Sequence, residues 1–63
     1  MEIQLTFGEE LALRRKRAEM SQAELGEKVG LHHWVISMFE KDKSLPTPEY
    51  EKAIRDILGW EAE

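Results

Sequence analysis

The spacing of apolar residues changes from an alternating pattern to a helical one near residue 6. Ile3 and Leu5 alternate with polar residues, which predicts a strand-like or flexible arm over residues 1–6. After this segment, apolar residues recur three or four positions apart, which is the period of one face of a helix. The pattern therefore predicts several helices for the rest of the chain.

Two capping boxes set the starts of the first two predicted helices. Thr6 and Ser21 are each followed three residues later by a glutamate. In such a pair, the side chain of each residue can accept a hydrogen bond from the backbone N–H of the other. We therefore expect a first helix over residues 8–18 and a second over residues 22–29. Gly30 follows the second helix, at a position where glycine commonly ends a helix.

The third predicted helix has two different sides. It is expected over residues 33–42, with Ile36 and Phe39 as its buried stripe. The residues on the opposite ridge are His33, Trp34, Ser37, Met38 and Lys41. The pattern thus separates a core-facing side from a side that faces away from the core.

A fourth helix is predicted after a polar loop. Residues 42–46 lack a helical period, and Thr47 then precedes Pro48, a residue type favoured in the first turn of a helix. Gly59 is well placed to end this helix. The residues expected to face the core are Tyr50, Ala53, Ile54, Ile57 and Leu58.

Length and composition predict a single small domain over residues 1–63. The hydrophobic core of a chain with 63 residues contributes no more than about 3 to 5 kcal/mol net. A hydrophobic content of 41% favours a folded chain over a disordered one, and the absence of cysteine excludes disulfides. Apolar runs are far too short for a membrane span, and no signal segment is evident. We therefore expect a soluble, cytoplasmic protein.

The charge balance does not by itself favour a nucleic acid as partner. Nine Lys and Arg residues against thirteen Asp and Glu residues give a net charge of −4. This is the wrong sign for binding polyanions through overall charge. A basic run over residues 14–17 falls at the end of the first predicted helix, where cations complement the helix dipole. The positions of the charges therefore matter more than their sum.

Two short helices joined by a glycine turn form a helix-turn-helix, and the residues around this turn carry a family resemblance. In chain order these residues are Met20–Leu25, Val29–Leu31, Ile36–Ser37, Phe39–Lys41, Lys43 and Pro46. They closely resemble the lambda-repressor-like DNA-binding domains of the Cro and Xre type over roughly residues 7–60. The resemblance implies a compact all-α domain of four or five helices. It also implies a sequence-specific transcriptional regulator that binds double-stranded DNA.

The resemblance further implies roles for single residues. Arg15 and Glu40 match a pair that usually forms a partly buried, structural salt bridge. Gln22 matches a position that commonly bonds a DNA phosphate, and Lys43 matches a loop position that often contacts the DNA backbone. For Gln22 and Lys43, the alternative is an ordinary solvated side chain.

By the same resemblance, the exposed ridge of the third helix would enter the major groove. The residues placed there are His32, His33, Trp34, Ser37, Met38 and Lys41. Such ridges are usually rich in side chains with forked donors and acceptors, and these base-facing positions have none. His33 and Ser37 can hydrogen-bond to base edges. Trp34 and Met38 can only pack on thymine methyls or sugars, so the readout would be largely apolar.

Three positions depart from the usual pattern of the family. Glu19 stands where the family often has glycine, and His32 replaces the common Ser or Thr cap with a weaker one. Gly26 replaces a small alanine, which costs about 1 kcal/mol of helix propensity. Many relatives carry a fifth helix that helps them to dimerise. The apolar pattern of this sequence predicts four helices, so the resemblance does not imply how two copies of the chain would form a homodimer.

A protein-binding module is the main alternative to DNA binding. Tryptophan is enriched in interface hot spots and methionine adapts to varied surfaces, so Trp34 and Met38 are also suited to a protein partner. A further interpretation is that Trp34 folds back over the second helix and Met38 over the following loop. Trp60 is expected to cover the chain's own core, and the alternative is that Trp60 and the arm around Ile3 and Leu5 pack between two copies of the chain.

The sequence predicts no catalytic or cofactor site. No Ser or Thr has an evident base partner for nucleophilic catalysis. His32 and His33 point about 100° apart on a helix, so they do not easily chelate one metal ion together. We therefore expect no enzymatic activity, metal, cofactor, small-molecule substrate or membrane partner.

Overall fold

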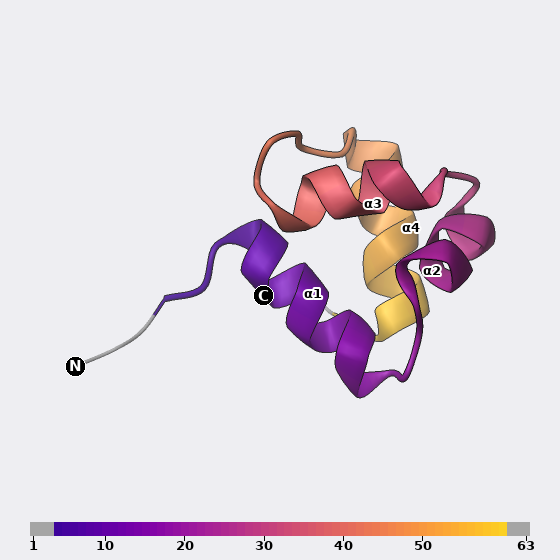
Figure 1. Ribbon diagram of the computed structural model, residues 1–63, viewed down its shortest axis with the longest axis horizontal. Helices are drawn as coiled ribbons and strands as arrows, with labels where there is room; N and C mark the ends of the chain where they lie inside the picture. Colours follow the sequence, from indigo (N-terminus) through magenta and orange to yellow (C-terminus); the bar gives the residue numbers. More distant parts are fainter. Residues whose placement is uncertain (1–3, 61–63) are drawn as a thin grey trace.

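Four helices account for most of the chain between residues 4 and 60, the residues that this computed structural model describes. They are α1 (Phe7–Arg17), α2 (Gln22–Val29), α3 (His33–Glu40) and α4 (Pro48–Leu58). No strand occurs within the described residues. In Figure 1, α3 lies across the top of the view with α4 behind it, and α1 and α2 lie to the left and right. The predicted all-α class of fold is confirmed.

The helix limits agree with the predicted ones to within one residue, except at the end of the third helix. Thr6 and Ser21 form the two predicted capping boxes, and α1 lies one residue before its expected limits. The prediction for the third helix is wrong at its end, because α3 stops at Glu40. Asp42, the expected last residue, has a φ of +58°. This left-handed conformation cannot continue a right-handed helix.

The predicted N-terminal arm is only partly covered by the structure. Residues 4–6 form neither helix nor strand. Residues 1–3, including Ile3, lie outside the described part of the chain. Within residues 4–6, Thr6 serves as the N-cap of α1, so the end of the predicted arm is used to start this helix.

The core takes at least one apolar residue from every helix. Its buried members are Leu11, Leu25, Ile36, Phe39, Ile54 and Trp60. The predicted core-facing stripe of α4 is wrong at Tyr50 and Ile57, which keep 39% and 38% of their surface exposed. Among the helices, α4 packs mainly against α2. A single neighbouring helix covers only part of the apolar stripe of α4, so the rest of the stripe stays exposed.

Two glycines allow backbones to approach each other closely. A Cβ atom at Gly8 in α1 would lie 2.4 Å from the carbonyl oxygen of Phe39 at the end of α3. A Cβ atom at Gly26 in α2 would lie 2.4 Å from the carbonyl oxygen of Leu31. Neither position accepts alanine without a shift of the backbone. The interpretation of Gly26 as a residue that merely lowers helix propensity is therefore wrong.

Trp60 closes the core between α1 and the end of α4. Its ring stacks on Phe7 with 5.2 Å between the ring centroids, and only 8% of its surface is exposed. The guanidinium groups of Arg55 and Arg14 lie 4.3 Å and 5.1 Å from the Trp60 ring centroid. These distances allow cation–π attraction. Trp60 therefore covers the chain's own core, as the sequence predicted.

We expect Gly26→Ala to destabilise the protein although alanine is the better helix former. The added methyl group would overlap the Leu31 carbonyl, and overpacking of this kind typically costs about 1–3 kcal/mol. Urea unfolding followed by circular dichroism measures the change. The reverse substitution Ala23→Gly, at an exposed position of the same helix, gives the effect of propensity alone. An unchanged or higher stability of Gly26→Ala would show that the Leu31 turn relaxes easily.

The cap of α2 should make stability depend on pH. The backbone N–H of Ser21, assisted by its side chain, lowers the pKa of Glu24 below the ordinary glutamate value. The folded state therefore binds this proton less readily than the unfolded chain. The resulting stabilisation is fully present above the ordinary glutamate pKa of about 4.3 and is lost as the pH falls through the lower pKa of the folded state.

We expect Glu24→Gln to reduce this acid-dependent loss, because glutamine accepts a hydrogen bond without titrating in this range. Urea unfolding at neutral pH and at a series of acidic pH values measures the effect. The control is Glu27→Gln, which removes the same charge from an exposed position of α2 outside the capping box. Equal pH dependence in the two variants would show that the cap does not contribute.

Candidate nucleic-acid interface

A short turn joins α2 to α3 and lets the two helices pack on each other. Residues 30–32 join the two helices, and Gly30 takes a left-handed φ of +81°. The backbone N–H of Leu31 donates to the carbonyl oxygen of Gly26 at 2.7 Å, which ties the turn to the end of α2. α2 and α3 pack directly on each other. Together they form the helix-turn-helix that the sequence predicted.

One side of the N-terminal half of α3 is open to solvent. Trp34 keeps 58% of its surface exposed, and His32 and His33 are exposed beside it. Ser37 and Met38 follow on this helix and are half-buried. The interpretation that Trp34 is covered by packing over α2 is therefore wrong. The exposed indole instead gives α3 a large apolar surface that is available for contacts with a partner.

Arg15 and Glu40 form a bidentate salt bridge between α1 and the end of α3. Nε of Arg15 donates to Oε2 of Glu40 at 2.6 Å, and Nη2 donates to Oε1 at 3.2 Å. The side chains are only 11% and 9% exposed. The remaining Nη1 group donates to the carbonyl oxygen of Met20 at 2.8 Å. The pair therefore connects the end of α1, the start of α2 and the end of α3.

Gln22 belongs to the same network. Its Nε2 group donates to Oε1 of Glu40 at 3.0 Å, and its side chain is half-buried. As the first residue of α2, Gln22 lies among backbone N–H groups that have no acceptor within the helix. The structure thus places Gln22 at an anion-favouring helix end while one of its amide hydrogens is already bonded.

Exposed lysines flank the helix-turn-helix. Lys41 is the C-cap residue of α3, Lys43 follows it in the loop, and Lys28 lies in the last turn of α2. The backbone N–H of Lys43 donates to the carbonyl oxygen of Met38 at 3.0 Å, which holds the start of the loop against α3. The helix-turn-helix therefore carries cations in spite of the negative net charge of the chain.

Asp42 has a structural role that the sequence analysis missed. Its carboxylate accepts hydrogen bonds from the hydroxyl of Thr6 and from the backbone N–H of Gly8, the latter at 2.9 Å. Asp42 therefore caps α1 from the loop after α3. The only sequence signal was indirect, because Asp tolerates the left-handed conformation better than most residues. Its charge serves the N-terminus of α1, where a negative group is favourable.

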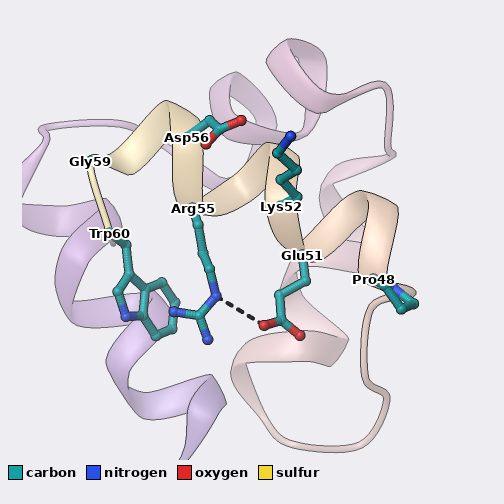
Figure 2. Close-up of a pocket in the computed structure, with 7 residues that line it drawn as sticks. All are labelled: Pro48, Glu51, Lys52, Arg55, Asp56, Gly59 and Trp60. Carbon is teal, nitrogen blue, oxygen red and sulfur yellow. Dashed lines mark hydrogen bonds and ion pairs between the residues drawn. The ribbon is translucent and has the colours of Figure 1, made fainter. Parts of the chain in front are cut away.

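A shallow hollow of about 520 Å³ lies beside α4. Figure 2 shows the Arg55 side chain between Trp60 and Glu51, whereas Lys52 and Asp56 point away from these three residues. Nε of Arg55 donates to Oε2 of Glu51 at 2.9 Å, and the guanidinium lies against the Trp60 ring. Arg55 already has partners within the protein, so this wall of the hollow supports the packing of Trp60.

The described part of the chain contains neither a membrane-spanning helix nor a cluster of metal ligands. Between residues 4 and 60, no helix combines the length and the apolar character that a membrane crossing requires. Over the same range, His, Cys, Asp and Glu side chains do not gather in threes that could hold a metal ion.

Comparison with known proteins finds the same motif. A family model described as helix-turn-helix matches residues 11–60. A crystal structure of the P22 c2 repressor protein, in complex with synthetic operator 9T in the presence of Tl⁺, is similar with a TM-score of 0.88. The two chains share 31% sequence identity, over 92% of this chain and 88% of that chain. None of the curated proteins compared with this chain matches it.

We expect loss of one partner of the salt bridge to unfold much of the protein. Glu40→Met would leave the guanidinium of Arg15 buried without its carboxylate, which costs about 3–5 kcal/mol. This equals the whole stability expected of so small a core, about 3 to 5 kcal/mol. The double variant Arg15→Met/Glu40→Met should recover most of the loss, because apolar residues of similar length often replace a buried pair without penalty. Urea unfolding of both variants tests this, and a folded single variant would contradict it.

Proposed function

Because the chain belongs to the helix-turn-helix family whose model matches residues 11–60, we propose that it is a sequence-specific, DNA-binding transcriptional regulator. It acts by binding double-stranded DNA and carries no enzymatic activity. The observation that carries this proposal is the exposed side of α3, centred on Trp34, in a domain similar to a repressor crystallised with a synthetic operator. In this proposal α3 enters the major groove.

Contacts with phosphates would position the domain on the duplex. The N-terminus of α2 offers unbonded backbone N–H groups, and Gln22 lies at its first position. Lys41 and Lys43 extend from the end of α3 and the following loop. Such contacts fix the register of the domain but carry little sequence information. Because the cations are few, the affinity should depend only weakly on salt concentration.

The base contacts would combine two polar residues with two apolar ones. His33 and Ser37 can donate to or accept from base edges, and His32 stands at the entrance of α3. Trp34 and Met38 present apolar surface, which suits the C5-methyl group of thymine. Discrimination between bases would therefore come largely from shape and apolar contact.

A homodimer would place two copies of α3 on adjacent half-sites. A single short helix with few charged contacts offers little affinity, whereas two half-sites separated by about one helical turn, roughly 34 Å, allow both copies to bind. The DNA site would then be an inverted repeat. Sedimentation of the protein with and without the selected DNA measures this stoichiometry.

The test is selection from a random double-stranded DNA pool, followed by titration of the enriched site at two salt concentrations. An enriched inverted repeat would support both DNA binding and dimer formation. Replacing each thymine of that site by uracil removes only the methyl group and so tests the apolar readout. Failure to enrich any sequence would contradict the proposal and direct attention to a protein partner for Trp34 and Met38.

We expect Trp34→Ala to weaken binding to the selected site by about tenfold, or about 1.4 kcal/mol. Its stability should change by no more than about 0.5 kcal/mol, because the side chain is largely exposed. Fluorescence anisotropy of labelled DNA measures affinity, and urea unfolding measures stability. The control is Tyr50→Ala, which removes a partly exposed aromatic side chain from α4. Equal loss of affinity in both variants would contradict the proposed contact between Trp34 and the bases.

A further inference from the structure

Gln22 is held in one orientation by Glu40. A carboxylate can only accept hydrogen bonds, so the amide group of Gln22 must turn its nitrogen toward Oε1 of Glu40. The same oxygen also accepts from Nη2 of Arg15 at 3.2 Å. Since the amide nitrogen carries two hydrogens, this bond uses one of them and leaves the other free.

The carboxylate that orients Gln22 is itself fixed. Glu40 is bound through both oxygens to Arg15, and Arg15 also donates to the carbonyl oxygen of Met20. Met20 lies two residues before Gln22 in the chain. The network therefore forms a closed loop that begins and ends at the start of α2. A side chain held in this way loses little conformational freedom when it binds a further group.

We propose that Glu40 is a positioning residue for DNA binding, which holds the amide of Gln22 so that its second N–H donates to a backbone phosphate. This inference rests on the proposed function. Glu40 does not touch the phosphate in this arrangement. Its negative charge is offset by Arg15, so it orients the amide without a full unpaired charge near the DNA.

The first test asks whether the contribution of Gln22 depends on Glu40. Gln22→Met removes the amide while keeping a side chain of similar length. It is introduced into the parent chain and into Arg15→Met/Glu40→Met, which lacks the network but has the same net charge. Affinity for the selected DNA is measured for all four proteins by fluorescence anisotropy. Circular dichroism and urea unfolding establish that each protein is folded at the assay temperature.

We expect Gln22→Met to weaken binding about tenfold in the parent, as for a hydrogen bond to a charged group. In the background without the network, the amide is no longer held in place and contributes little to binding. The same substitution should therefore weaken binding less than about twofold there. An equal loss in both backgrounds would overturn the positioning role while leaving DNA binding intact. Failure of the parent chain to bind any selected DNA would overturn the proposed function, and the positioning role with it.

The second test observes the amide directly and does not depend on stability. Gln4 and Gln22 are the only residues with side-chain amides, so two pairs of side-chain N–H signals are expected by NMR. Gln22→Met identifies the pair that belongs to Gln22. Addition of DNA should shift the free hydrogen and leave the hydrogen bonded to Glu40 nearly unchanged. Movement of the bonded signal to the position of a solvated amide would show that Gln22 releases Glu40 on binding and would overturn the proposal.

Discussion

The salt bridge between Arg15 and Glu40 is the interaction on which the arrangement of the first three helices depends. It joins α1 to the end of α3, and Arg15 also bonds the backbone at Met20, where α2 is about to begin. Removing two charges from water offsets much of their attraction, so the pair contributes little net stability over an apolar replacement. Its main contribution is to fix the orientation of the groups that it joins. Hydrogen bonds fix the angles between groups, whereas apolar contacts do not, and only the carboxylate can orient Gln22.

The net charge of the chain is negative, and several of its acidic groups have partners within the protein. Glu9 and Glu24 complete capping boxes, and Asp42 caps α1 from a distance. Glu10, Glu40 and Glu51 each pair with an arginine. The helix N-termini partly offset the charge of their carboxylates, and the three ion pairs cancel locally at the expense of three arginines. Lys28, Lys41 and Lys43 lie exposed on the helix-turn-helix and the following loop, so an interface for a polyanion there depends on the placement of charges rather than on their sum.

The helices and their starts could be predicted from the sequence because their causes are local. The hydrogen bonds of the capping boxes at Thr6 and Ser21 span only three residues, so they can be inferred from residue types at that spacing. The departure at Glu19, where the resemblance implies a glycine in many relatives, also has a local explanation. Glu19 has a φ of +57°, a conformation that glycine adopts without the penalty paid by other residues. The Arg15–Glu40 pairing, by contrast, came from the resemblance, since their separation along the chain gives no local signal.

The sequence by itself determined where the helices lie, which residues can cap them and which side of α3 faces the core, because these properties depend on neighbours within one helical turn. Only the tertiary structure decided the contacts between distant segments. It showed that Gly26 is required by the Leu31 carbonyl, that Asp42 caps α1 and that Tyr50 stays exposed. It also showed that Gln22 bonds Glu40. Each of these depends on the distance and direction between two helices or loops, which residue spacing along one chain does not specify.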